Sequence, residues 1–183
     1  LDVIKKAKKL KGKIWTIGIT NQRETTILWI KKNDKVVYKA IVWQDRRTEE
    51  FCKKLRSQNR ETSFFNKTGL LIDPYFSATK VKWVLDNIPL AKKLMKKDEL
   101  LFGTIDSFLI WRLTKQQVHA TDATNASRTM LYNISTNKWD DGILKLLKIK
   151  KNILPEVKDC SDDFGSTHSS ITCLLYTSDA ADE

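Results

Sequence analysis

The sequence has few of the residues that characterise fibrous, linker-rich or membrane-spanning chains. Only six Gly and three Pro occur among its 183 residues, which excludes collagen-like and linker-dominated proteins. Its apolar runs are as short as Phe108–Trp111, whereas a membrane span needs about 20 apolar residues. No apolar segment with a basic head opens the chain, so no secretory signal peptide is evident. These absences predict one globular domain in the cytoplasm.

Cysteine and histidine are also scarce. The three cysteines, Cys52, Cys160 and Cys173, are odd in number and far apart, and no C-x-x-C motif occurs. The only histidines are His119 and His168. A disulfide framework or a structural zinc site is therefore not expected, and a reducing compartment fits best.

The sequence lacks the common short motifs of phosphoryl transfer and nucleophilic catalysis. Neither the G-x-x-x-x-G-K-[ST] nor the G-x-G-x-x-G phosphate-binding loop occurs. With two histidines, no Ser/His/Asp arrangement is evident either. The residues alone thus show no phosphoryl-transfer machinery, and they predict no metal site.

What the chain has in excess is lysine. It carries 33 Lys+Arg against 22 Asp+Glu, a formal charge of +11, and 26 of the basic residues are Lys. Such a balance is typical either of a protein that binds anionic partners or of solvated helix faces. We favour solvated faces over nucleic-acid binding, because phosphate forks and base readout favour Arg. The lysines form three blocks, at residues 5–13, 92–97 and 145–151.

The order of predicted elements indicates an α/β domain with a mixed sheet. Strands come first and are then interleaved with helices, which is the pattern of this class. Asp106 is expected to cap the helix that follows it. The expected helices cover residues 1–10, 47–57, 60–66, 77–87, 90–97, 107–114 and 140–148, and the expected strands cover 14–20, 25–30, 36–43 and 100–104.

The last residues differ in character from the rest. Cys173–Glu183 resembles the translation of a sequencing-library adapter joined to an incomplete transcript. We therefore expect residues 172–183 to be a non-native tail and residues 1–171 to be the native domain.

Arg23 and Glu24 form the first candidate site. They lie side by side in a turn between two predicted strands. Glu accepts and Arg donates hydrogen bonds, so together they suit a neutral polyol, whose hydroxyls do both. A surface turn with a weak ion pair explains the same residues, and spacing alone favours that alternative.

Two aromatic residues are further candidates. Trp43 ends the third predicted strand, where it could cover the carbon side of a polyol. Tyr75 follows Pro74, which could aim the Tyr75 hydroxyl at a ligand. A core Trp and a packed aromatic at a helix start are the alternatives, so the residues by themselves indicate half of a polar pocket.

Several long motifs in one order resemble the glycerol kinase branch of the FGGY carbohydrate kinases, over about residues 14–165. NQRE at the first turn resembles this branch and not the pentulose kinases. The motifs are GITNQRETT (18–26), IVWQDRR (41–47), GLLIDPYFSATKVKW (69–83), ELLFGTIDSFLIW (99–111) and TDATNASRTMLYNI (121–134).

The resemblance implies an actin-like ATPase or ribonuclease H-like fold, incomplete at both ends. It implies transfer of the γ-phosphoryl group of ATP to glycerol, assisted by Mg²⁺, in a full-length protein expected to be a homo-oligomer. By position, Arg23, Glu24, Trp43 and Tyr75 match the family's glycerol contacts. Another FGGY polyol or sugar kinase, and a non-catalytic lysine-rich binding protein, are the alternatives.

The resemblance also implies that much of the machinery lies outside this chain. The phosphate-binding hairpin would precede Leu1, and the catalytic base and adenine-binding domain would follow Ile171. Phosphoryl transfer depends on positioning and on neutralising charge, which this segment would not supply alone. We expect the isolated chain to be inactive.

Overall fold

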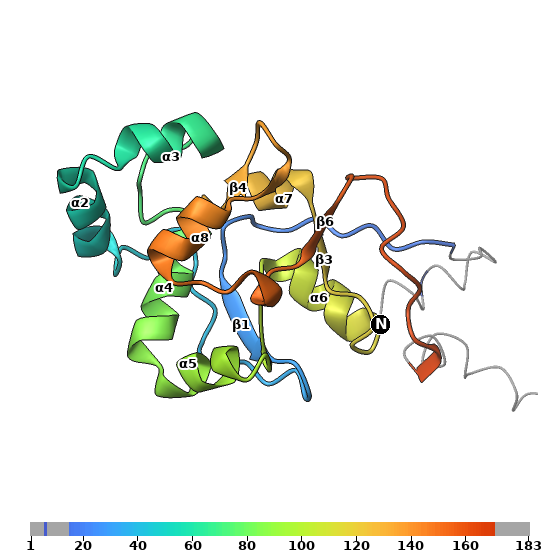
Figure 1. Cartoon of the computed structure of the whole chain (residues 1–183). Coiled ribbons are helices and arrows are strands. Elements are labelled where there is room, and N and C mark those ends of the chain that lie inside the picture. Colours follow the sequence, from blue (N-terminus) through green and yellow to red (C-terminus); the bar gives the residue numbers. More distant parts are fainter. Residues whose placement is uncertain (1–5, 7–14, 171–183) are drawn as a thin grey trace, which may run out of the picture.

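The computed structural model describes residue 6 and residues 15–170 (Figure 1). The helix expected over residues 1–10 (apart from Lys6), the first residue of the strand expected over 14–20, and the expected tail at 172–183 lie outside the described residues.

The centre of the domain is a short sheet buried on both faces. β1 (Ile27–Ile30) pairs antiparallel with β2 (Leu100–Gly103), with Ile27 opposite Gly103. Because side chains alternate along a strand, Leu28 faces the large hydrophobic core, whereas Trp29 faces a smaller cluster with Trp111. The strands predicted over 25–30 and 100–104 are confirmed.

The third predicted strand, over residues 36–43, is wrong as a continuous element. Only isolated bridges form on the free edge of β1, from Val36 to Trp29 and from Ile41 to Thr26. The backbone bends at residues 37 and 38, which interrupts the ladder. The bend turns Tyr38 toward Trp83, with ring centroids 5.3 Å apart.

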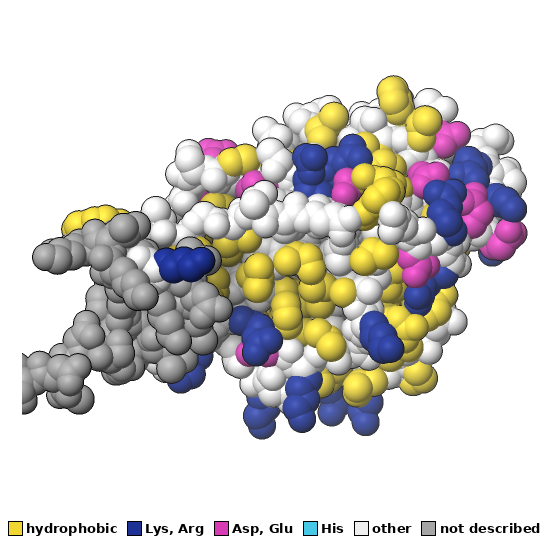
Figure 2. All heavy atoms as spheres, turned by 180° about the vertical axis from the view of Figure 1, so that it is seen from behind, with side chains coloured by type: hydrophobic (Ala, Val, Ile, Leu, Met, Phe, Trp, Pro, Cys, Tyr) yellow, Lys and Arg dark blue, Asp and Glu magenta, His cyan; other side chains and the backbone are white. Residues whose placement is uncertain are grey.

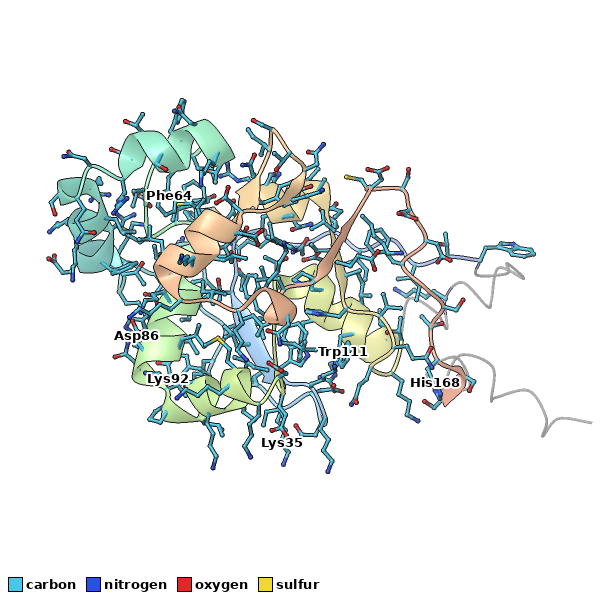
Figure 3. The ribbon with its side chains drawn as sticks, in the orientation of Figure 1. Lys35, Phe64, Asp86, Lys92, Trp111 and His168 are labelled. Atoms are coloured by element: carbon cyan, nitrogen blue, oxygen red, sulfur yellow. The ribbon has the colours of Figure 1, made fainter. Side chains whose placement is uncertain are left out.

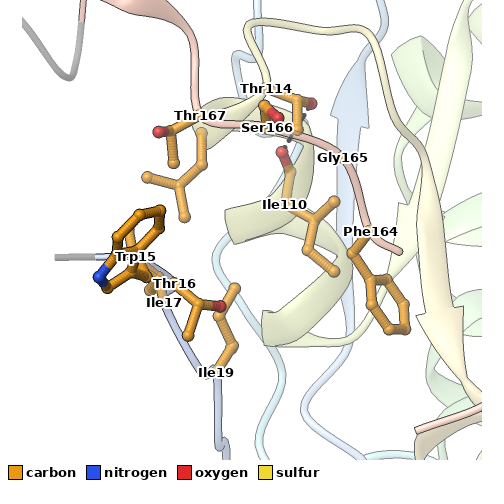
Figure 4. A pocket seen from close by; sticks show the side chains of 11 residues that line it. Trp15, Thr16, Ile17, Ile19, Ile110, Thr114, Phe164, Gly165, Ser166 and Thr167 are labelled. Atoms are coloured by element: carbon orange, nitrogen blue, oxygen red, sulfur yellow. Dashed lines mark hydrogen bonds between the residues drawn. The ribbon is translucent and has the colours of Figure 1, made fainter. Parts of the chain in front are cut away.

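The strand predicted over residues 14–20 is also wrong. In the described range 15–20 the backbone forms no strand and no backbone hydrogen bond with another described residue. A strand needs a neighbour to complete its ladder, however high its β-propensity. Its apolar side chains, Trp15 and Ile17 among them, instead line a cavity of about 210 Å³ with Ile110 of α6 (Ile105–Leu113) and Phe164 (Figure 4).

Four helices follow β1 along the chain, and α4 and α5 lie nearer to it than α2 and α3 do (Figure 1). Each predicted helix of this stretch is confirmed to within two residues, and α4 has its predicted bounds. Ala78, Val81 and Val84 of α4 are buried in the large core. The helices are α2 (Glu49–Ser57), α3 (Glu61–Thr68), α4 (Ser77–Asn87) and α5 (Pro89–Lys96).

The second half adds shorter elements around the same core. β3 pairs parallel with β6, and β4 forms an antiparallel pair with β5. The helix predicted over 140–148 is α8, whose N-cap Asp140 accepts from the Ile143 amide at 2.8 Å. The elements are α6 (Ile105–Leu113), β3 (Ala120–Asp122), α7 (Ala123–Ser127), β4 (Tyr132–Asn133), β5 (Lys138–Trp139), α8 (Asp141–Leu147), the 3-10 turn η1 (Lys151–Ile153) and β6 (Glu156–Lys158).

Asp106 is not the N-cap of α6, contrary to the prediction. Thr104 occupies that position, and the buried Asp106 lies in the first turn. Its carboxylate accepts from the hydroxyls of Thr104 and, at 2.6 Å, Thr121. Burial raises the pKa of Asp106, against the effect of these hydroxyls. Asp106 therefore ties α6 to β3, a long-range contact that local spacing does not reveal.

Apolar side chains are gathered in the core, and charged side chains lie mainly at the surface. Phe64 and Trp111 are buried, whereas Lys35 and Lys92 are exposed (Figure 3). All lysines of the 92–97 and 145–151 blocks are exposed, as solvated helix faces demand. From behind, Lys and Arg side chains gather along the lower edge, where α5 lies in Figure 1 (Figure 2). Within the described residues, no helix is both long and apolar enough to cross a membrane.

His119 makes the stability of the fold depend on pH. Its Nε2 donates to the Phe102 carbonyl at 2.8 Å, and the rings of Trp29 and Trp111 pack against it edge-on. Burial lowers the pKa of His119 to about 4, from 6.5. The unfolded chain therefore binds the proton more tightly, so the stabilisation is complete above pH 6.5 and is lost as the pH falls toward 4.

We expect the free energy of unfolding to fall by about 2 kcal/mol between pH 7 and pH 5 through this residue. Urea denaturation of the chain at the two pH values measures the loss. His119→Gln, which keeps a donor but does not titrate, should remove most of it, and the control His168→Gln should leave it in place. An unchanged pH dependence in His119→Gln would contradict the assignment.

Candidate functional site

The turn before β1 places Glu24 in an unusual backbone conformation. Its φ is +65°, in the left-handed region that non-glycine residues seldom adopt. The Glu24 side chain is nevertheless buried, with 4% of the residue exposed. Arg23 beside it is exposed, and its side chain has no hydrogen bond or ion pair with another described residue. The two neighbours therefore point into different surroundings.

The buried carboxylate of Glu24 is paired with Arg128. Arg128 Nε donates to Glu24 Oε1 at 2.8 Å, across 104 residues of sequence. The guanidinium carbon also lies 5.0 Å from the Phe76 ring centroid and 5.7 Å from that of Tyr75. Arg128 thus joins the carboxylate to the aromatic side of the site.

Trp43 and Tyr75 form the aromatic part. Their ring centroids lie 5.3 Å apart with the planes at 51°, and both residues are half-buried. The Tyr75 amide donates to Asp73 Oδ1 at 2.8 Å, and Arg46 donates to the same oxygen at 3.0 Å. These bonds fix the loop that precedes α4, so Tyr75 is held beside Trp43.

The first turn of α4 contacts the main chain of Glu24 and Tyr75. The Ser77 hydroxyl donates to the Glu24 carbonyl at 3.1 Å, and Lys80 Nζ donates to the Glu24 and Tyr75 carbonyls. Lys80 is fully buried, and burial lowers its pKa to about 8, opposed by the charges of Glu24, Asp45 and Asp73. The Ala78 amide donates to the Thr129 carbonyl at 2.8 Å.

An open cleft of about 610 Å³ adjoins these residues. Tyr75 and Arg128 line it together with Phe76 and the loop from Gly69 to Asp73. A carboxylate, guanidinium groups and an aromatic pair can accept from hydroxyls, donate to them and cover a short carbon chain. Glu24, Arg23 and Trp43 do not line this cleft, so it is the chemistry of the whole cluster, and not of the cleft alone, that suits a small neutral polyol.

The structure brings together three of the four predicted site residues. Glu24 is joined to Tyr75 through Lys80 and Arg128, and Tyr75 contacts Trp43. Arg23 adjoins the cluster only through the chain. Lys80 and Arg128 were not predicted as site residues: Lys80 reads as one more lysine of an amphipathic helix, and no spacing signal connects Arg128 to the first turn.

The amino-acid sequence matches the family model described as "FGGY family of carbohydrate kinases, N-terminal domain" over residues 2–175. The chain belongs to the FGGY family of carbohydrate kinases.

Curated relatives agree with this assignment. The glycerol kinase of Bradyrhizobium sp. (strain ORS 278) is 55% identical over 166 residues, which is 91% of this chain and 33% of the relative. The glycerol kinase of Marinomonas sp. (strain MWYL1) is 59% identical over 152 residues, 83% of this chain and 31% of the relative. The chain thus spans about a third of the length of the curated relatives it matches.

Solved structures confirm the fold. A crystal structure of Plasmodium falciparum glycerol kinase with ADP matches with a TM-score of 0.87 at 37% identity, over 91% of this chain and 34% of that one. A gluconate kinase from Lactobacillus acidophilus matches with a TM-score of 0.80 at 25% identity, over 94% of this chain and 34% of the other. The predicted α/β class and actin-like ATPase fold of the FGGY kinases are confirmed.

Proposed function

We propose that this FGGY chain is the acceptor-binding part of a glycerol kinase. The full-length enzyme transfers the γ-phosphoryl group of ATP to a terminal hydroxyl of glycerol, giving sn-glycerol 3-phosphate and ADP. The observation that carries the proposal is the 55% identity to curated glycerol kinases across 91% of the chain. The polar and aromatic cluster around Glu24 supports it, since its chemistry suits a neutral polyol.

Four residues would bind glycerol. Glu24, whose carboxylate is preorganised by Arg128, would accept hydrogen bonds from the hydroxyls. The exposed Arg23 guanidinium has no hydrogen-bond partner among the described residues, so its donors would also bind glycerol hydroxyls. Trp43 would cover the carbon chain, and the Tyr75 hydroxyl would bind one substrate oxygen. Holding glycerol in one orientation presents its terminal hydroxyl for transfer, which is the contribution of this segment.

ATP and Mg²⁺ would be the co-substrate and its metal ion in the full-length enzyme. In the described part of the chain, no group of three or more His, Cys, Asp and Glu side chains could hold a metal ion. We propose that the ligands of Mg²⁺ and of the nucleotide lie mainly outside this chain, and that the described residues act on glycerol. Their role is confined to the acceptor, and we propose that the isolated chain is inactive.

A substrate panel tests the proposal on the full-length kinase that carries this segment. ADP release is followed with glycerol, erythritol and a pentulose as acceptors. We expect the highest kcat/KM with glycerol, and no ADP release above background from the 183-residue chain alone. A higher kcat/KM for erythritol or the pentulose would contradict the glycerol assignment and favour another FGGY kinase.

The remaining expectations about organisation stay proposals. We propose that residues 1–171 belong to the kinase domain and that residues 172–183 are non-native. Mass spectrometry of the endogenous protein would test the second point, because a peptide containing Cys173–Glu183 would contradict it. Homo-oligomeric assembly and a cytoplasmic location of the full-length protein are predictions of the same kind.

A further inference from the structure

The start of α4 contacts the main chain of two residues that we propose bind glycerol. Lys80 Nζ donates to the carbonyls of Glu24 and Tyr75, and the Ser77 hydroxyl donates to the Glu24 carbonyl. We propose that Lys80, assisted by Ser77, is a positioning residue that fixes the Glu24 turn and the Tyr75 loop relative to each other. This inference rests on the proposed function, because it assigns a role within the same acceptor site.

The burial of Lys80 needs an explanation that packing alone does not supply. The residue has 0% exposure, and lysine is almost never fully buried unless it is paired. Among the described residues, its hydrogen-bond partners are main-chain carbonyls, and its side chain forms no ion pair. An apolar side chain of similar length would fill the space without the cost of desolvating an ammonium group. What the ammonium adds is a link between two carbonyls from separate segments.

The Glu24 backbone adopts a conformation that needs contacts from other segments to hold it. A left-handed φ at a non-glycine residue persists only where surrounding contacts determine it. The Glu24 carbonyl accepts from three side chains: Thr26 Oγ1 at 3.2 Å, Ser77 Oγ at 3.1 Å and Lys80 Nζ at 3.4 Å. Two of these three donors come from the first helical turn of α4. The direction of the Glu24 side chain is therefore set from α4.

The same turn also holds the segment that carries Arg128. The Ala78 amide, which has no partner within its own helix, donates to the Thr129 carbonyl at 2.8 Å. Residue 129 is adjacent to Arg128, the partner of the Glu24 carboxylate. One helix start thus determines the position of the carboxylate, of its arginine and of the tyrosine loop.

Lys80→Met in the full-length kinase tests the assignment. The variant keeps the length of the side chain and removes the donor. We expect KM for glycerol to rise about tenfold, the value of a lost hydrogen bond from a charged group. KM for ATP should stay within about twofold. The melting temperature should fall by a few degrees, because the Glu24 and Tyr75 carbonyls lose a buried donor, so the rise in KM for glycerol is the deciding readout. A merely structural role would lower the melting temperature and leave KM for glycerol unchanged.

Lys82→Met is the matched control, because Lys82 lies on the same helix and pairs with Asp86, whose side chain is 51% exposed. It should change none of the three quantities. If Lys80→Met does not fold, Ser77→Ala decides: a rise of about threefold in KM for glycerol supports the inference, consistent with one lost neutral hydrogen bond. An unchanged KM for glycerol in a folded Lys80→Met, or in Ser77→Ala, overturns it.

Failure of the proposed function gives a different result. In that case the wild-type kinase does not phosphorylate glycerol, whatever the variants do. The KM comparison is then made with the acceptor that the panel identifies, and a tenfold rise for that acceptor in Lys80→Met still supports the positioning role.

Discussion

Replacing Glu24 with glutamine in the full-length kinase is expected to lower kcat/KM for glycerol about 100-fold. The substitution preserves the shape of the side chain but removes the charge that strengthens hydrogen bonds from substrate hydroxyls. Bonds to a charged acceptor contribute about 1.5–3 kcal/mol each, and 2.7 kcal/mol corresponds to a factor of 100. Because Glu24 is 4% exposed, solvent does not screen this difference. Steady-state kinetics with glycerol varied at saturating ATP measures the effect.

Glu50→Gln is the control for the loss of one negative charge in the same domain. Glu50 forms a surface ion pair with Lys53, and its side chain is 84% exposed. Exposed pairs of this kind contribute about 0–1 kcal/mol, so kcat/KM should change by less than about twofold. Equal kinetics in Glu24→Gln and wild type would remove Glu24 from the set of substrate ligands.

Helices were predictable from the sequence because their signals are local. In α4, the residues Val81, Val84 and Leu85 recur with helical spacing, and the helix buries this face. The helix predicted over residues 90–97 begins one residue earlier, at Pro89, because the fixed φ of proline suits the first position of a helix. Each helix of the 49–96 region follows from residues within its own length.

Strands were predicted less well because pairing is not local. Residues 15–20 have the composition of a strand, but no described segment pairs with them. Conversely, β6 is only Glu156–Lys158, a short and mostly polar segment that is a strand because it pairs parallel with Ala120–Asp122. β-propensity measures how well a residue fits a pleated surface, and the partner decides whether that surface exists.

The candidate site was predictable where residues adjoin in sequence and not where the fold brings them together. Glu24, Trp43 and Tyr75 lie in motifs that could be recognised, and they form one cluster with their neighbours. Arg128 lies 104 residues from Glu24, so its pairing depends on the turn that the Ala78 amide anchors. Lys80 differs from the surface lysines only in its burial, which a single sequence does not display.

Arg128→Met is expected to lower the free energy of unfolding of the chain by about 2–3 kcal/mol. The Glu24 side chain is 5% exposed, so removing the arginine leaves a buried carboxylate without its ion-pair partner. The loss of one partner of such a pair costs several kcal/mol when both are buried. We place the value at the lower end because the Arg128 side chain is 33% exposed. Urea denaturation at neutral pH measures it.

Arg112→Met is the matched control. Arg112 is exposed, and its guanidinium carbon lies 5.7 Å from the Phe108 ring centroid. The guanidinium carbon of Arg128 lies at the same distance from the Tyr75 ring centroid. We expect its unfolding free energy to stay within about 0.5 kcal/mol of wild type. A loss in Arg112→Met equal to that in Arg128→Met would show that stacking on an aromatic ring, and not the carboxylate, accounts for the effect.

The double variant Glu24→Gln/Arg128→Met separates the pair from its surroundings. Once the carboxylate is a neutral amide, removing the arginine no longer leaves a buried charge unpaired. The cost of Arg128→Met should therefore be at least about 1 kcal/mol smaller in the Glu24→Gln background than in wild type. Additive losses would mean that Arg128 acts through Tyr75 and Phe76 alone, and the preorganised carboxylate would no longer support glycerol binding at this site.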